Sequence, residues 1–302
     1  MMVILMGKGV GHKVARRTLV SGGTGQLGVE LMRRLGEDVA TAPLRGQFDV
    51  SSAAAVDRTV GSVKPDLIIH AGAMTAVDMC EDHRLDAYRA NAVGTWNLAR
   101  AADRVGAEMV YVSTNYVFPG DKLGPYLEYD SPRPINAYGQ SKYHGELAAQ
   151  QVLDRLYVVR TSWLYSRWRK NFVTSFIRRV DKGVSGGEVG MGYVGDQVAN
   201  PTHAGDLAAA IIQLSETGAY GTHHLVNGGG TSWYGWALAI LRELDVDGVR
   251  LDEISADEFE RPAAIPANSE LGNEMARSLG ISMRPWNTAL VEFIRELRAQ
   301  RE

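Results

Sequence analysis

The stretch RTLVSGGTGQLGVEL, residues 17–31, joins a short apolar run to a glycine-rich turn. The first five residues, RTLVS, favour a β-strand. Residues 25–36 repeat leucine at every fourth position and favour an amphipathic helix that ends at Gly36. Because a strand, a turn and a helix in this order form the repeating unit of parallel sheets, the stretch predicts an α/β fold.

Similar units recur along the chain. Further strands are expected at residues 38–42, 65–73, 108–114, 156–163 and 222–227, and further helices at about 85–105, 138–152 and 206–214. This alternation predicts a Rossmann-type, doubly wound parallel sheet. After Trp163 the alternation weakens, and residues 192–206 and 250–270 are expected to be irregular loops.

The pattern also predicts the domain boundaries. Residues 1–16 are expected to be an N-terminal extension, because the apolar run Val3–Met6 is too short for a signal peptide. Residues 17–165 are expected to form an NAD(P)-binding Rossmann domain, to which residues 203–230 return. Residues 166–302 are expected to form mainly a smaller C-terminal substrate-binding lobe.

Composition excludes several classes of protein. The formal net charge of −3 and the scattered basic residues give no electrostatic footprint for nucleic acid. No apolar run approaches the length that spans a bilayer, so we expect no membrane partner. The single cysteine, Cys80, excludes an internal disulfide and suits a reducing cytoplasm, where we expect the protein to reside.

Gly22, Gly25 and Gly28 have the G-x-x-G-x-x-G spacing of a dinucleotide-binding turn. Such glycines permit a tight turn, close approach of the backbone to a pyrophosphate, and close packing of the helix on the strand. The second predicted strand, DVATA, does not end in a carboxylate that would bind a ribose 2′-hydroxyl. Arg45 follows it and is either a partner of an NADPH 2′-phosphate or a solvated loop charge. We expect NADPH as coenzyme, with NADH as the alternative.

The stretch NAYGQSKYHGE, residues 136–146, places Tyr138 and Lys142 one helical turn apart. Tyrosine has an ordinary pKa near 10, and a neighbouring ammonium stabilises the tyrosinate and brings that pKa toward working pH. Thr114 ends the strand EMVYVST, at the edge where parallel sheets bind ligands. Together these three residues predict a carbonyl-reducing site with Tyr138 as general acid.

The chain resembles the extended short-chain dehydrogenases/reductases, and among them the dTDP-4-dehydrorhamnose reductases. The resemblance runs from about residue 17 to the end. It rests on GGTGQLGVEL, PDLIIHAGAMTAVDMCE, NAVGTWNLARAA, YVSTNYVFPG, NAYGQSK, VVRTSWLY, NFV, DQVANPT and NSEL. It implies NAD(P)H-dependent reduction of the C4 ketone of a dTDP-linked sugar, dTDP-4-dehydro-6-deoxy-L-mannose, to dTDP-L-rhamnose.

The resemblance also implies roles for individual residues. The residues that it assigns to the coenzyme are Gly22, Gly25, Gln26, Leu27, Gly28, Asp49, Val50, Ala71, Gly72, Ala73, Val112, Tyr138 and Lys142. The residues that it assigns to the sugar nucleotide are Thr75, Val77, Thr114, Asn115, Trp163, Gln197 and Asn200. Trp163 precedes an apolar residue, so packing in the core is its alternative role. His70 is expected to be a core histidine, and Cys80 a small buried apolar residue.

Two departures from the family pattern bear on the substrate. Asn115 stands where the family usually has aspartate, and Ile265 stands where it usually has arginine. They leave open a 4-ketoreductase of another nucleotide-linked deoxy sugar, or of a dihydrostreptose-type precursor, in antibiotic biosynthesis. A third alternative is a non-catalytic subunit, such as the regulatory subunit of a methionine adenosyltransferase. The complete Thr114–Tyr138–Lys142 set argues against it.

Some members of the family dimerise through Mg²⁺ held by glutamates. Glu30 matches one such position, but the other positions are not identified, so the sequence assigns no metal ligand and leaves a homodimer as an open expectation.

Overall fold

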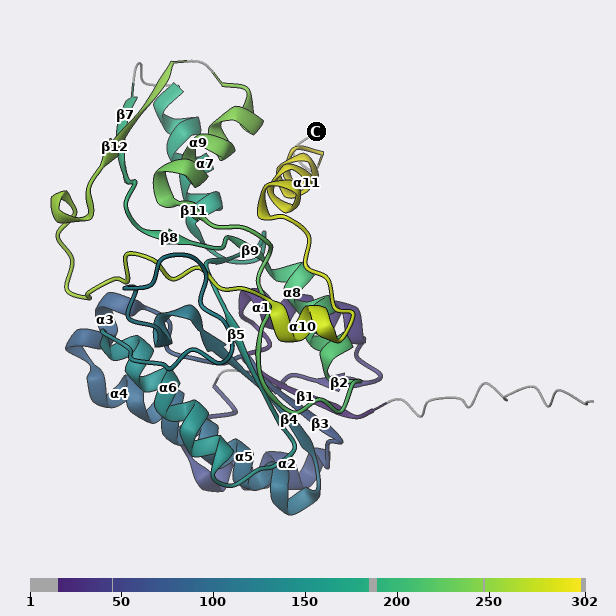
Figure 1. The fold of residues 1–302 in the computed structure, drawn as a ribbon. Helices are drawn as coiled ribbons and strands as arrows, with labels where there is room; N and C mark the ends of the chain where they lie inside the picture. Colours follow the sequence, from purple (N-terminus) through teal and green to yellow (C-terminus); the bar gives the residue numbers. More distant parts are fainter. Residues whose placement is uncertain (1–15, 45, 185–188, 247, 300–302) are drawn as a thin grey trace, which may run out of the picture.

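Six parallel strands form the central sheet of the structure, a computed structural model that describes residues 16–44, 46–184, 189–246 and 248–299 (Figure 1). In sheet order they are β10 (Gly221–His224), β5 (Leu156–Thr161), β4 (Glu108–Thr114), β3 (Leu67–His70), β1 (Thr18–Ser21) and β2 (Ala40–Thr41). All six predicted strands are therefore confirmed, although several are shorter than expected. The predicted extension lies outside the described residues as far as residue 15, and so does Arg45.

Helices cover both faces of the sheet, which confirms the Rossmann-type fold (Figure 1). Leu19 and Ile68 contribute to one apolar core, while their neighbours Val20 and Ile69 contribute to another on the opposite face. This follows from the strand period of two residues. The first core includes residues of α2 (Ala53–Val63), α5 (Gly94–Val105) and α6 (Ala137–Gln150). The second includes residues of α1 (Gln26–Leu35), α8 (Ala204–Leu214) and α10 (Glu274–Ser278).

The helix expected over residues 85–105 is not uniform. It consists of α4 (Arg84–Tyr88), a π-helical turn over Arg89–Val93, and α5, and α3 (Val77–Asp82) precedes it. A π turn shifts the helix by one residue and often occurs where a side chain is needed at a particular place. Here it carries Asn91, whose side chain is fully buried and bonded outside the helix.

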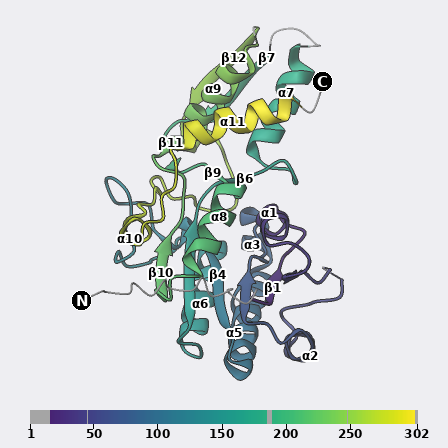
Figure 2. The ribbon, with the colours of Figure 1, turned by 90° about the vertical axis from the view of Figure 1, so that its right-hand side faces the viewer.

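A smaller lobe stands beyond the carboxyl ends of the strands (Figure 2). It contains α7 (Phe172–Val184), α9 (Trp233–Leu244) and a parallel pair of strands, β7 (Val189–Val194) and β12 (Val249–Ile254), and α11 (Trp286–Arg298) packs against it. Short pairs join β6 (Leu164–Tyr165) to β9 (Thr202–His203), and β8 (Val198–Ala199) to β11 (Thr231–Ser232).

The predicted loops 192–206 and 250–270 were therefore partly wrong. The first contains the end of β7 and all of β8 and β9, and the second begins inside β12. β7 and β12 pair with each other across a long sequence separation, which local patterns do not reveal. Among the described residues, no helix is both long and apolar enough to cross a membrane.

Candidate active site

The glycine turn after β1 is shaped for a dinucleotide. Gly22 has a φ of 77°, and a Cβ at this position would lie 2.6 Å from the Cα of Gly72. A Cβ on Gly28 would lie 2.2 Å from the carbonyl oxygen of Gly22, whereas one on Gly25 would meet only that oxygen, at 3.2 Å. Two glycines are thus required by packing, and the third leaves its backbone accessible to a ligand.

The start of α1 adds a positive dipole end to this turn. Gly25 is the N-cap residue and makes no side-chain hydrogen bond to the first turn of the helix, which fits a bound pyrophosphate. The backbone of residues 71–73, expected to line the nicotinamide, follows β3 directly and touches Gly22. Leu27 is buried in the core beneath the turn, whereas the Gln26 side chain is half-buried and bonds to residues after β5.

The residues expected near the adenine lie in the loop between β2 and α2. Asp49 is exposed, and its carboxylate accepts hydrogen bonds from the backbone N–H and the hydroxyl of Ser51, at 2.9 and 2.7 Å. Val50 packs against the core, where it touches the backbone of α5 at Gly94. Asp49 thus shapes the loop locally and keeps an exposed carboxylate.

Thr114 and Tyr138 lie together at the carboxyl end of β4. Thr114 is the last residue of the strand and is 6% exposed. Asn136 caps α6, and Tyr138 follows it by two residues in the first turn of the helix. Burial raises the pKa of Tyr138 above 10, and a hydrogen bond with the Thr114 hydroxyl acts in the opposite direction. The ring of Tyr138 packs edge-on against that of Tyr116, with centroids 6.1 Å apart.

Lys142 lies one turn further along α6 and is 1% exposed. Its Nζ donates to the carbonyl oxygen of Val112 at 2.7 Å and lies 4.2 Å from the ring centroid of Tyr111. Burial lowers the pKa of Lys142 to about 7, although the carboxylate of Glu146 opposes that shift. The sequence predicted a positively charged ammonium beside Tyr138. With a pKa of about 7, the Lys142 amine is only partly protonated at neutral pH.

The residues expected to contact the sugar nucleotide differ in exposure. Thr75 is exposed and Val77 is half-buried at the start of α3, whereas Asn115 and Gln197 are buried. Asn200 is fully buried, accepts from the backbone N–H of Leu271 at 2.8 Å, and donates to backbone carbonyls of two loops. Its hydrogen bonds therefore join the loop after β10 to the segment at Leu271.

Trp163 packs in an aromatic cluster, and its contact with the sugar stays a prediction. It is half-buried, its φ is 36°, and its ring stacks on that of Trp233 with centroids 3.6 Å apart. A positive φ is strained for a bulky residue and persists only where the surroundings enforce it. The cluster that enforces it is aromatic and includes Trp236 and Phe172.

Two groups of polar residues near this site were missed from the sequence. Asn91 bonds to both the N–H and the carbonyl of Met74, at 2.8 and 3.0 Å, and so fixes the loop after β3. Glu146 and Arg160 form a buried bidentate ion pair, at 3.1 and 2.7 Å, and Glu146 also accepts from the hydroxyl of Ser113, the residue before Thr114. A π turn and a pair between a helix and a strand depend on tertiary packing, so neither gives a local sequence signal.

The remaining predictions concern residues without a proposed catalytic role. His70 is fully buried, and its Nδ1 lies 2.5 Å from the Ser21 hydroxyl oxygen. Burial, together with the charge of Lys142, lowers its pKa to about 3, as suits a core histidine. Cys80 is buried, and burial raises its pKa to about 11. Glu30 accepts from the indole of Trp168 at 2.6 Å. The described part of the chain contains no group of three or more histidine, cysteine, aspartate or glutamate side chains suited to a metal.

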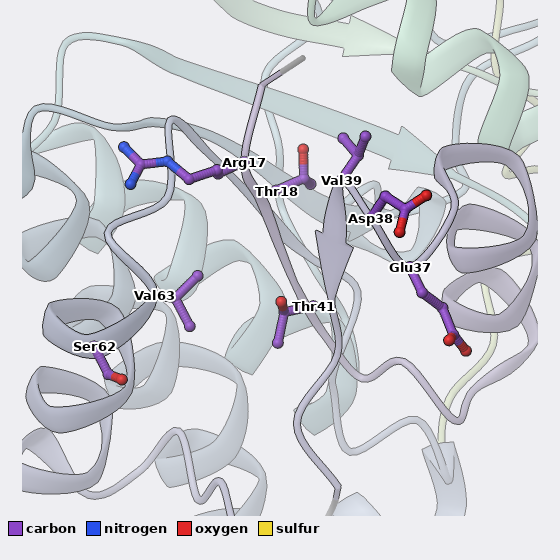
Figure 3. Close-up of a pocket in the computed structure, with 8 residues that line it drawn as sticks. All are labelled: Arg17, Thr18, Glu37, Asp38, Val39, Thr41, Ser62 and Val63. Atoms are coloured by element: carbon purple, nitrogen blue, oxygen red, sulfur yellow. The ribbon is translucent and has the colours of Figure 1, made fainter.

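The cavity drawn in Figure 3 is separate from all of these residues. It has a volume of about 200 Å³ and is lined by Arg17, Thr18, Val39 and Ser62, among others, near the amino ends of β1 and β2. Ligands of open parallel sheets bind beyond the carboxyl ends of the strands, so this cavity is not the candidate site.

The protein has a Rossmann-type sheet, a glycine turn after β1, and a tyrosine and a lysine one turn apart beside β4. Together these features define the class of extended short-chain dehydrogenases/reductases. Within this class, the family model described as "RmlD substrate binding domain" matches residues 16–299. The chain belongs to that family.

Individual relatives are similar over nearly their whole length. A probable dTDP-4,6-dihydroxy-2-methyloxan-3-one 4-ketoreductase of Streptomyces antibioticus is 37% identical, with 94% of this chain and 96% of the relative covered. The dTDP-4-dehydrorhamnose reductase of Escherichia coli is 33% identical, with 92% and 97% covered. The crystal structure of the Bacillus anthracis dTDP-4-dehydrorhamnose reductase in complex with NADP has a TM-score of 0.89 and 36% identity, and covers 94% of this chain and 100% of that one.

Proposed function

We propose that this protein is an NAD(P)H-dependent 4-ketoreductase that converts dTDP-4-dehydrorhamnose to dTDP-L-rhamnose. The observation that carries this proposal is that Thr114 and Tyr138 lie together at the carboxyl end of β4, with Lys142 bonded to Val112 of the same strand. They lie at the same edge of the parallel sheet as the glycine turn after β1, in a chain of this family. The bound coenzyme supplies the hydride. The protein's residues orient the ketone, donate a proton and balance charge.

The proposed roles follow from the chemistry of each group. The Thr114 hydroxyl hydrogen-bonds the ketone oxygen, and the Tyr138 hydroxyl donates its proton to that oxygen as negative charge develops there. Because burial raises the pKa of Tyr138, its anion needs a nearby positive charge. Protonated Lys142, fixed by the Val112 carbonyl, provides that charge.

We also propose a division of work between the two parts of the chain. Residues 17–165, together with residues 203–230, bind the coenzyme, and the rest of residues 166–302 bind most of the sugar nucleotide. Supporting this proposal, β10 completes the large sheet, whereas the aromatic cluster with Trp163 lies in the lobe. We expect the reaction to take place in the cytoplasm.

A second candidate substrate is another dTDP-linked 4-keto deoxy sugar. The name of the Streptomyces antibioticus relative favours it. So does Asn115, which donates to the Oγ and the backbone oxygen of Ser269, at 2.8 and 3.3 Å. Asparagine is neutral, so this site lacks the negative charge that the family pattern has there, and a carboxylate could not donate to that backbone oxygen.

Product analysis separates the two candidates. The purified protein is incubated with NADPH and, separately, with dTDP-4-dehydrorhamnose and a panel of other dTDP-4-keto deoxy sugars. We expect the highest kcat/KM for dTDP-4-dehydrorhamnose, with dTDP-L-rhamnose as product. A higher kcat/KM for another sugar would select the second candidate, and no turnover of any sugar would contradict the reductase proposal.

The coenzyme preference is part of the proposal. β2 ends without a carboxylate that would repel a 2′-phosphate, so NADPH should be at least as good as NADH. If Arg45 binds the 2′-phosphate, Arg45→Ala lowers the ratio of kcat/KM for NADPH to that for NADH by about tenfold, the value of one charge-assisted hydrogen bond. An unchanged ratio would contradict the role of Arg45.

A further inference from the structure

The segment Leu164–Asn171 of the lobe lies on the start of α1. The Gln26 side chain joins the two, because its Nε2 donates to the carbonyl oxygen of Leu164 at 3.1 Å. Its Oε1 accepts from the Ser166 hydroxyl and from Nδ2 of Asn171, both at 3.0 Å. The family resemblance places Gln26 on the pyrophosphate, but its side chain forms hydrogen bonds that hold this segment.

Trp168 fixes the middle of the same segment. Its Nε1 donates to Glu30 at 2.6 Å, and the guanidinium groups of Arg33 and Arg167 lie 5.1 and 5.0 Å from its ring centroid. Gln26, Glu30 and Arg33 lie on one face of α1, at i, i+4 and i+7. The segment is therefore attached along two turns of the helix.

This attachment places Arg169 at the glycine turn. Its Nε donates to the carbonyl oxygen of Thr24 at 2.7 Å, and both Arg169 and Thr24 are exposed. In the part of the chain that the structure describes, no carboxylate pairs with the Arg169 guanidinium. Since one of its five N–H groups bonds to Thr24, four remain for another acceptor at this turn.

We propose that Arg169 binds a phosphate group of the nicotinamide dinucleotide. This inference rests on the proposed function, because it takes the glycine turn as the coenzyme site. A guanidinium matches two oxygens of a phosphate in a planar, charge-assisted contact, and the uncapped N-terminus of α1 attracts the same charge. The segment that follows Trp163 thereby links the coenzyme to the lobe.

The coenzyme carries two groups that a guanidinium at this turn binds by the same chemistry, the pyrophosphate and the 2′-phosphate of NADPH. Thr24 immediately precedes Gly25 and α1, where a pyrophosphate lies. It also follows Gly23, where an added Cβ would lie 2.3 Å from the Cβ of Ala42 in the loop after β2. The experiment distinguishes the two by using ligands that carry one or both groups.

The test is equilibrium binding of NADPH, NADH and ADP-ribose, followed by quenching of tryptophan fluorescence, for wild type, Arg169→Gln and Lys170→Gln. Lys170 is the exposed neighbour with the same charge and serves as the matched control. At low salt, Arg169→Gln should weaken binding by about tenfold, Lys170→Gln should change it little, and Arg169→Lys should restore part of it. Thermal unfolding monitors the fold of each variant.

Equal weakening of all three ligands assigns Arg169 to the pyrophosphate, and weakening of NADPH alone assigns it to the 2′-phosphate. Unchanged affinities in Arg169→Gln would overturn the inference, and so would an equal loss in Lys170→Gln, because that would reflect general electrostatics. If wild type binds none of the three ligands, the proposed function fails instead.

Discussion

The two groups of residues that we propose for the active site, here called its two walls, differ in their chemistry. On the side of the large sheet, Thr114, Tyr138 and Lys142 are polar groups that are anchored to the backbone of β4 and α6. On the side of the lobe, Trp163 lies in a stack of aromatic rings from separate segments, with Trp233 against it. Proton transfer requires groups at fixed positions and with tuned pKa values, whereas holding a sugar ring requires a broad apolar surface. Substitutions in the first wall should therefore act on kcat, and those in the second mainly on KM.

The largest effect is expected at Tyr138. Tyr138→Phe removes the proton donor and leaves the ring to pack on Tyr116. We expect kcat to fall by about 10²–10⁴-fold, the usual range for general acid catalysis, with coenzyme binding nearly unchanged. Single-turnover kinetics and coenzyme titration measure the two quantities. A wild-type kcat would show that another group donates the proton.

The second effect concerns the charge of Lys142. Because the pKa of Lys142 is about 7 in the free protein, the fraction with a positive charge falls as the pH rises through that value. We therefore expect kcat/KM for the coenzyme, which reports groups of the free enzyme, to decline above about pH 7. Lys142→Met should lack this decline and should lower both kcat and coenzyme affinity, by about tenfold or more for the loss of a charged hydrogen bond.

Lys142→Arg is the control for that experiment. Arginine keeps its charge at all accessible pH values, so the decline should disappear while part of the activity remains. If wild type and Lys142→Met showed the same pH profile and the same coenzyme affinity, Lys142 would have no role beyond filling space beside Tyr111.

The difference between the two walls also explains what the sequence could predict. The glycine turn, the strand-end threonine and the Tyr138–Lys142 spacing depend on neighbours in the chain, so short patterns identified them, and the strands of the large sheet were found for the same reason. The Trp163–Trp233 stack and the Glu146–Arg160 pair join distant segments. Only the tertiary fold creates them.

The same reasoning accounts for the incorrect predictions. Residues 249–252 alternate between apolar and polar, but the pattern stops at Glu253, and the strand is completed by its pairing with β7. Trp163 was expected inside a strand, but β5 ends at Thr161 and the tryptophan takes a positive φ that no propensity favours. Both lie in or next to the lobe, where tertiary packing overrides local preference.

A smaller effect is expected in the aromatic wall. Trp233→Leu removes the ring that stacks on Trp163. If Trp163 contacts the sugar, KM for the sugar nucleotide should rise by about tenfold, the cost of one aromatic contact of about 1.4 kcal/mol, with kcat little changed. Phe176→Leu is the matched control, because Phe176 packs in the same core but makes no ring contact with Trp163 among the aromatic contacts of the described residues. Equal changes in both variants would reduce the role of Trp163 to core packing.

The last expected effect is on stability, and it has the opposite sign to the effect on catalysis. The pKa of Lys142 is about 7 in the folded protein and about 10.4 in an unfolded chain. Between these values the unfolded chain binds more protons than the folded protein, so wild-type stability should rise with pH from about 7 to about 10. Below pH 7 the amine is protonated in both states, so this group should make no contribution to the pH dependence of stability. Lys142→Met avoids burying an amine and should unfold at a higher temperature near pH 7, by about 2–4 °C for each kcal/mol gained. The variant loses the hydrogen bond to Val112, and this loss offsets part of that gain.

Thermal unfolding of both proteins at several pH values measures the difference, which should shrink as the pH approaches 10. A difference that stays constant with pH would mean that Lys142 titrates in the folded protein as it does in water.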